Sequence, residues 1–183
     1  AALPGSLSAS KRRQGLPSQL PSVAIDYGEG LERAGKERPR GVDELEAKVC
    51  ASGSSWARMG AAALTKHVLA MGERLGVAEG MSVLDVGATC GHALAILQER
   101  HRHKLKAVGV DGSKESIKYA RRTCRGSFCV GDVRKLSGVA DESFDLAYTL
   151  SAPAQLVSQN EVCAIAREMG RVIRPGGRAM LVS

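Results

Sequence analysis

Short apolar runs alternate with amphipathic segments over most of this chain. Five runs have the length and composition of buried strands, at residues 83–86, 106–111, 127–133, 143–150 and, after a Pro-Gly-Gly turn, 178–182. Helical periodicity predicts helices over residues 54–76, 92–100, 113–124 and 159–173. Strands that alternate with helices predict an α/β domain with a doubly wound, mainly parallel sheet.

Acids and glycines gather where these predicted strands end. The first strand carries Asp85 and is followed by Gly87 and Gly91, which allow positive φ and a close approach of the backbone to a ligand. The second strand ends at Asp111, about 20 residues later, the spacing at which a carboxylate reaches ribose hydroxyls. Because ligands of open α/β sheets bind at the carboxyl ends of the strands, the pattern predicts a nucleotide-like ligand at this edge.

Five of these pieces together resemble the class I S-adenosylmethionine-dependent methyltransferases. They are Asp85–Gly91, Val110-Asp111, Gly131-Asp132-Val133, Phe144-Asp145 and Arg174-Pro175-Gly176-Gly177. The resemblance covers about residues 54–183 and implies a Rossmann-like fold with strand order 3-2-1-4-5 and S-adenosyl-L-methionine as the cofactor. A nicotinamide-dependent dehydrogenase is the nearest alternative, but its fingerprint is Gly-x-Gly-x-x-Gly, whereas the spacing here is Gly-x-x-x-Gly.

The resemblance also implies which residues hold the cofactor. Four residues are expected around its methionine part: Asp85, Gly87, Ala88 and Gly91. Asp111 is expected on the ribose, Asp132 with the amide of Val133 on the adenine, and Leu150 beside the site. The chain departs from the family pattern at Thr89, where a glycine is usual, and a β-branched residue there restricts φ. No catalytic residue and no metal site is assigned.

The chain carries a net charge of +7, and most of the excess lies after residue 82, with fifteen basic and ten acidic residues. The dense clusters are Arg100–Lys106 and a set on the predicted helix 113–124 and just after it: Lys114, Lys118, Arg121, Arg122 and Arg125. Such basic helix faces are candidates for nucleic-acid binding. A solvated helix face is the alternative, favoured because no aromatic residues are interleaved.

Residues 1–53 differ in composition from the rest and are expected to form an extended or disordered tail before a methyltransferase-like domain at 54–183. Proline and serine are frequent, and no acid precedes Asp26, as in a transit sequence or an ordinary disordered tail.

Five cysteines without a Cys-x-x-Cys pair argue for reduced, mostly buried thiols in an intracellular compartment, with cytoplasm and organelle left open. No apolar run approaches the roughly 20 residues that span a bilayer.

The family fold has two further strands after the fifth, and the sequence has no residues for them after Ser183. We therefore expect either a fragment of a longer protein or a truncated fold whose open sheet edge, like the tail, contacts protein partners.

Three functions follow from these observations. The first is S-adenosylmethionine-dependent methyl transfer to an unidentified acceptor; the segment Leu150–Ala154 lacks the Asn/Asp-Pro-Pro-aromatic signature of enzymes that methylate amino groups of bases or glutamine. The second is a catalytically silent methyltransferase-like subunit of a large complex. The third is an RNA-associated assembly factor that uses the basic helix faces.

Overall fold

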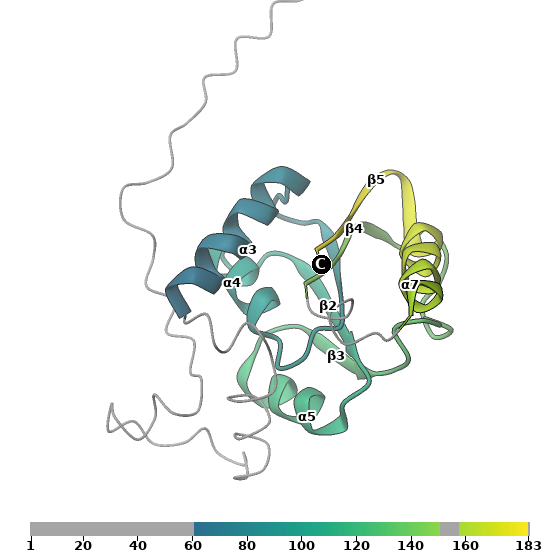
Figure 1. The fold of residues 1–183 in the computed structure, drawn as a ribbon. Coiled ribbons are helices and arrows are strands. Elements are labelled where there is room, and N and C mark those ends of the chain that lie inside the picture. The colour runs from purple at the N-terminus through teal and green to yellow at the C-terminus, as the bar shows by residue number, and fades with distance from the viewer. Residues whose placement is uncertain (1–60, 151–157, 183) are drawn as a thin grey trace, which may run out of the picture.

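A five-stranded parallel sheet forms the centre of the protein, with helices on both faces (Figure 1). The computed structural model describes residues 61–150 and 158–182. The strands are β1 Ser82–Val86, β2 Lys106–Asp111, β3 Ser127–Val130, β4 Phe144–Thr149 and β5 Ile173–Leu181, and they lie in the order β3-β2-β1-β4-β5. The described helices are α3 Ala61–Leu75, α4 His92–Arg100, α5 Lys114–Thr123 and α7 Gln159–Val172. The predicted fold class and strand order are confirmed.

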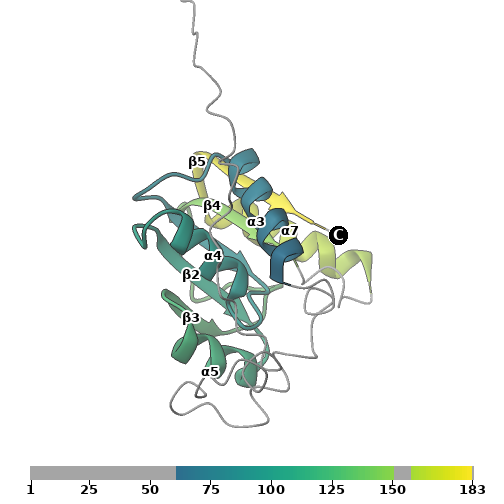
Figure 2. The same ribbon diagram turned by 90° about the vertical axis from the view of Figure 1, so that its left-hand side faces the viewer.

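The two faces of the sheet have separate apolar cores. Successive residues of β1 point to opposite faces, so that Val83 packs under α3, α4 and α5, while Leu84 packs under α7. Figure 2 shows α3 and α4 side by side in front of the strands, with α7 on the far side. On the α7 face the connection between β3 and β4 supplies the rest of the cover, through Leu136 and Val139.

Arg171 of α7 fixes that connection, which has no helix of its own. Its guanidinium donates to the carbonyls of Val139 and Leu136, both at 2.9 Å. Glu168, one turn earlier, accepts the backbone N–H of Leu136 at 2.7 Å. Because the connection is pinned to α7 by side chains, the carboxyl end of β3 has a defined path back to β4.

Serine side chains begin two of the helices. Ser113 accepts the N–H of Ser116 at the start of α5, and Ser158 accepts that of Glu161 at the start of α7. The predicted helix at 54–76 is confirmed over Ala61–Leu75. Residues 54–60 and the tail lie outside the described residues, so the domain boundary stays a prediction.

The fifth strand begins earlier than predicted. The structure ends α7 at Val172 and pairs Ile173 with Phe144, before the Pro-Gly-Gly turn. The register then shifts, so that Arg178 pairs with Leu146 and the turn becomes an irregularity within β5. Glycine at position 177 permits this pairing because it has no Cβ. A Cβ there would lie only 2.7 Å from the carbonyl oxygen of Asp145.

Candidate functional site

The loop after β1 has the backbone shape of a glycine-rich turn, even at the position where glycine is missing. The φ angles of Gly87, Thr89 and Gly91 are 83°, 46° and 78°. Thr89 therefore adopts the left-handed conformation, which costs a residue with a Cβ about 1–2 kcal/mol. The departure from the family pattern leaves the path of the loop intact and stores strain in it.

Replacing Thr89 with glycine is expected to raise the free energy of unfolding by about 0.5–1 kcal/mol. The relief of left-handed strain exceeds the entropy that glycine adds to the unfolded chain. Urea unfolding of the parent and the Thr89→Gly variant measures the difference, with Thr89→Ala as the control because alanine keeps a Cβ at the same φ. A Thr89→Gly variant less stable than the parent would contradict the prediction.

Asp111 joins this loop to the end of β2. Its Oδ2 accepts the backbone N–H of Thr89 at 2.9 Å, and its Oδ1 accepts the N–H of Ser113 at 2.8 Å. The amides of Gly87 and Ala88 donate to the carbonyl of Val110 at 2.8 and 3.0 Å. The half-buried carboxylate of Asp111 is thus held in one orientation at the carboxyl edge of the sheet, where the sequence predicts a ribose contact.

Asp85 is buried beneath the loop, with 2% of its surface exposed. Its Oδ2 accepts a hydrogen bond of 2.9 Å from the hydroxyl of Tyr148, which is itself fully buried. Burial raises the pKa of Asp85 to about 7, with a further contribution from the charge of Asp111, while the Tyr148 hydroxyl acts to lower it. Asp85 therefore changes its charge near neutral pH.

Asp132 follows β3 and is engaged by a neighbour. Its Oδ1 accepts from the Arg134 backbone N–H at 2.8 Å and from its Nε at 2.9 Å. These hydrogen bonds lower the pKa of Asp132. Arg134 also donates to Glu161 of α7 at 2.7 Å, so the turn after β3 is tied to that helix. The neighbouring Val133 is partly buried against the core on the α7 face.

The structure brings the expected residues to one edge of the sheet. The loop residues lie at the end of β1, Asp111 bonds to that loop, and the N–H of Gly131 donates to the Asp111 carbonyl at 3.0 Å. Leu150 follows β4 and belongs to the same apolar core as Ala88. Residues 151–157 lie outside the described residues, and the cofactor contacts of the eight residues stay a prediction.

Two features of the edge are missing from the sequence analysis. Tyr148 lies on a buried strand, and a buried tyrosine hydroxyl usually has a hydrogen-bond partner, which is the signal that identifies it. Arg134 was not connected with Asp132, although the two are only two residues apart.

Several secondary expectations need correction. From its place at the helix start, His92 could hydrogen-bond in the loop, cap α4 or face solvent; in the structure it packs edge-on against the ring of Tyr119 at 6.0 Å, and burial lowers its pKa to about 4. Cys90, expected with the other cysteines to be a reduced thiol, forms a disulfide bond. Cys129 and Cys163 are exposed rather than buried.

Two further side chains have structural roles. Asp145 is a structural residue at the start of β4, as expected, because it accepts the N–H of Ser82 at 2.7 Å. In the basic set on α5, Arg121 donates to the carbonyl of Phe128 at 2.7 Å, so part of its donor capacity serves the fold.

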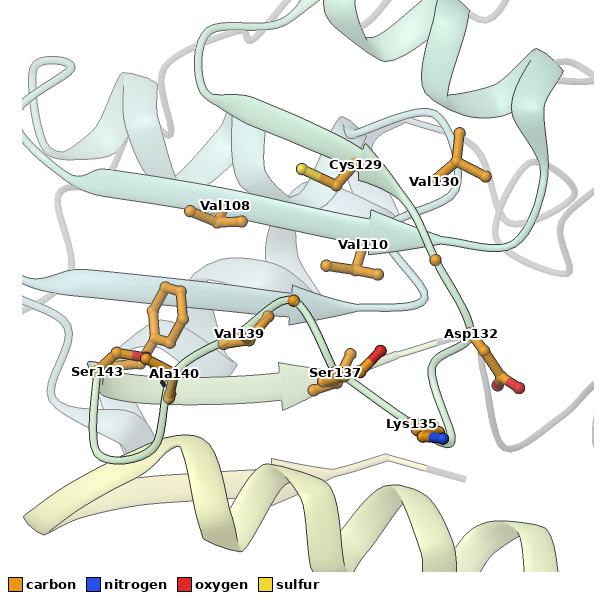
Figure 3. A pocket seen from close by; sticks show the side chains of 14 residues that line it. Val108, Val110, Cys129, Val130, Asp132, Lys135, Ser137, Val139, Ala140 and Ser143 are labelled. Carbon is orange, nitrogen blue, oxygen red and sulfur yellow. Dashed lines mark hydrogen bonds between the residues drawn. The ribbon is translucent and has the colours of Figure 1, made fainter.

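A pocket of about 560 Å³ lies on the α7 face of the sheet (Figure 3). Val108 and Val110 of β2 with Cys129 of β3 form its floor and the connection before β4 forms its wall, with Lys135 and Ser137 at the rim. It shares Asp132 with the expected cofactor residues, but Asp85, Asp111 and the loop after β1 do not line it. The pocket is therefore distinct from the arrangement at the ends of β1 and β2.

Within 61–150 and 158–182, no group of three or more His, Cys, Asp and Glu side chains is arranged to hold a metal ion. None of the helices in this part of the chain is long and apolar enough to cross a membrane.

Comparison with known proteins identifies relatives of this arrangement. Residues 83–177 match the family model described as a methyltransferase domain. The chain is 34% identical over 113 residues to Methyltransferase GfsG of Streptomyces halstedii, covering 58% of this chain and 38% of that protein. It is 31% identical over 121 residues to O-methyltransferase rstn1 of Aspergillus nomiae, covering 63% of this chain and 50% of that protein. The chain thus spans half or less of the length of these relatives.

Among solved structures, a similar chain occurs in the complex between the Haloferax volcanii Trm112 methyltransferase activator and a protein described as a methyltransferase. The TM-score is 0.54 with 31% sequence identity, and the match covers 63% of this chain and 49% of the other.

Proposed function

Because this chain belongs to the class I S-adenosylmethionine-dependent methyltransferases, we propose that it binds S-adenosyl-L-methionine at the carboxyl edge of its sheet and transfers the methyl group to an acceptor. The observation that carries the proposal is the hydrogen bond from the Thr89 amide to Asp111. It joins the glycine-containing loop and the ribose-type carboxylate into one cradle, in spite of the residue that departs from the family pattern.

The described residues fit such a cofactor. Positive φ at Gly87 and Gly91 turns the chain without side chains that would fill the cradle. Asp111 is only half-buried, so its carboxylate has capacity to accept ribose hydroxyls besides the two backbone amides. Asp132 would hold the adenine with the amide of Val133 and would share its carboxylate with Arg134. Asp85 would lie beneath the methionine part, and Leu150 would border the site.

The chemistry divides between cofactor and protein. When bound, the cofactor supplies a methyl group on a positively charged sulfur, which is the reactive centre. The residues of this chain bind and orient, so their contribution to the rate is proximity and alignment of the two reactants. The acceptor class favoured by the similarity to an O-methyltransferase is an oxygen nucleophile.

Calorimetric titration of the full 183-residue chain with S-adenosyl-L-methionine tests the proposal. Saturable binding, with S-adenosylhomocysteine competing for the same site, is the expected result. A second experiment follows the transfer of a labelled methyl group from the cofactor to a panel of hydroxyl, amine and RNA acceptors. Binding without transfer to any acceptor would favour the catalytically silent subunit. No binding of either compound would overturn the function.

A protein partner at the open sheet edge is the second part of the proposal. Within the described residues β5 pairs only with β4, and Leu181 near its end is 39% exposed. Unpaired backbone groups of an outer strand form a template for another chain. The similar chain bound to the Trm112 activator makes an activator-type protein the first candidate to test. Amide hydrogen exchange of β5 should slow when such a partner is added, and unchanged exchange would argue against this edge as the contact.

A further inference from the structure

Asp85 and Tyr148 form a buried pair that joins the two central strands next to the loop. The two residues are direct register partners of the parallel strands β1 and β4, although they are 63 positions apart in sequence. The hydroxyl of Tyr148 donates to Asp85 Oδ2 at 2.9 Å, and the exposed fractions of Tyr148 and Asp85 are 0% and 2%. In such buried surroundings a hydrogen bond to a carboxyl group is stronger than it would be in water.

Among residues 61–150 and 158–182, few other ionisable groups face this carboxyl. Asp111, at the end of β2, is the charged group that acts on it besides Tyr148. From α3, apolar side chains such as Leu64 and Val68 pack toward the sheet, and the ionisable side chains of that helix are exposed: Lys66, His67, Glu73 and Arg74. From α4, His92 packs against Tyr119 of α5.

We propose that Tyr148 is a positioning residue that sets the protonation of Asp85, and that binding of a cofactor with a cationic methionine part displaces the proton from Asp85. The second half rests on the proposed function; the first half concerns the ligand-free protein alone. The loop from Gly87 to Gly91 starts two residues after Asp85, so a cation held by that loop comes within reach of the carboxyl group.

The proton balance is simple. In the ligand-free protein the Asp85 carboxyl group is largely protonated at pH 6 and about half protonated at pH 7, because burial holds its pKa at about 7. On binding, the O–H bond of that carboxyl breaks, the proton passes to the solvent, and the carboxylate that remains accepts the hydrogen bond of Tyr148 and faces the bound cation. The hydroxyl of Tyr148 stabilises the charged form, so its removal raises the pKa of Asp85 further and makes the displacement harder.

The sign of the pH effect differs between the free protein and the complex. The pKa of Asp85 in the folded protein, about 7, lies above its ordinary value of 3.8, so its contribution to stability is present at low pH and is lost as the pH rises through 7. Cofactor binding requires the charged form, so affinity increases over the same range. Stability of the ligand-free protein and affinity for the cofactor should therefore change in opposite directions.

The dissociation constant of S-adenosyl-L-methionine, measured from pH 5.5 to 9, tests the second half. For the parent, affinity should rise by up to about tenfold per pH unit below 7, and above 7 it should change only with the titration of the cofactor's own amino group near pH 8. Tyr148→Phe should move this midpoint upward by about one pH unit and weaken binding at pH 7 by up to about tenfold, since one hydrogen bond is worth about that much. Asp85→Asn should show only the titration of the cofactor's own amino group near pH 8.

Tyr119→Phe is the matched control, because it removes another buried tyrosine hydroxyl and should keep the midpoint of the parent. A midpoint that is the same in the parent and in Tyr148→Phe would overturn the positioning role. Calorimetry of the parent in two buffers of different ionisation enthalpy gives a second measure, and binding at pH 6.5 without proton release would overturn the displacement.

A titration of the ligand-free protein tests independently whether Tyr148 sets the protonation of Asp85. The carbon-13 shift of the Asp85 carboxyl, assigned with Asp85→Asn, should titrate near pH 7 in the parent and about one unit higher in Tyr148→Phe. Equal midpoints would refute the role of Tyr148. If the parent binds no S-adenosyl-L-methionine at any pH, the proposed function and the displacement fail together, and this titration still tests Tyr148.

Discussion

Replacing Gly91 with alanine is expected to lower the free energy of unfolding by about 3 kcal/mol. Gly91 stands at the start of α4 with φ of 78°, a conformation that costs alanine about 1–2 kcal/mol. The added Cβ would also lie 2.9 Å from two atoms of the Phe128 ring and 3.1 Å from Cys124 Sγ. Phe128 is buried in the core on the α4 face, so its ring cannot move aside without disturbing other packed side chains.

Gly80 offers a matched control for the steric part of this effect. Its φ is 86°, and a Cβ added there would meet nothing within 4 Å. Gly80→Ala should therefore cost only the conformational part, about 1 kcal/mol. Urea unfolding of the two variants gives both numbers. Equal losses of stability would show that the contact with Phe128 is relieved at little cost and would contradict the steric argument.

Replacing Asp111 with alanine is expected to weaken S-adenosyl-L-methionine binding by about 1–3 kcal/mol, or roughly 5- to 150-fold, the scale for losing hydrogen bonds to a charged group. In the proposed complex this carboxylate would accept ribose hydroxyls, and in the structure it already holds Thr89 and Ser113. Calorimetric titration measures the change. Asp111→Asn should lose less, because the amide oxygen still accepts a hydrogen bond.

Glu99→Ala is the control for the change in net charge, because Glu99 lies near the end of α4 that is remote from the loop. It should bind the cofactor as the parent does. Unfolding of Asp111→Ala without cofactor separates a loosened loop from a lost contact. An unchanged dissociation constant in Asp111→Ala, with binding shown for the parent, would remove Asp111 from the site.

The sequence determined the architecture of this protein because that information is local. Runs such as Lys106–Asp111 have the length and apolar content of buried strands, and alternation with helices permits few ways to arrange a parallel sheet. The positions of the strand ends could also be predicted from the sequence, since acids and glycines mark where the chain turns at the carboxyl edge of the sheet. The cap at Ser113 is local in the same sense, because the capping side chain bonds to an amide three residues away.

The start of β5 was not visible in the same way. The sequence shows a Pro-Gly-Gly turn, and a turn normally separates a helix from a strand. Pairing with β4 nevertheless begins at Ile173, because the partner strand can accommodate a shift in register after Phe144. Which residues pair across two strands depends on both strands, and that information is not present in either segment alone.

The electrostatics of the candidate site were decided by tertiary structure. The sequence placed Asp85 and Asp111 at the ends of neighbouring strands. It gave no sign that Asp85 is buried and hydrogen-bonded to a tyrosine 63 residues away, or that Asp111 is half-buried and holds the loop. It flagged Thr89 as a departure, whereas its φ of 46° leaves the loop intact. The types and spacing of residues reveal local chain geometry. The charge of a carboxyl group depends instead on the dielectric environment and on partners that only folding brings together.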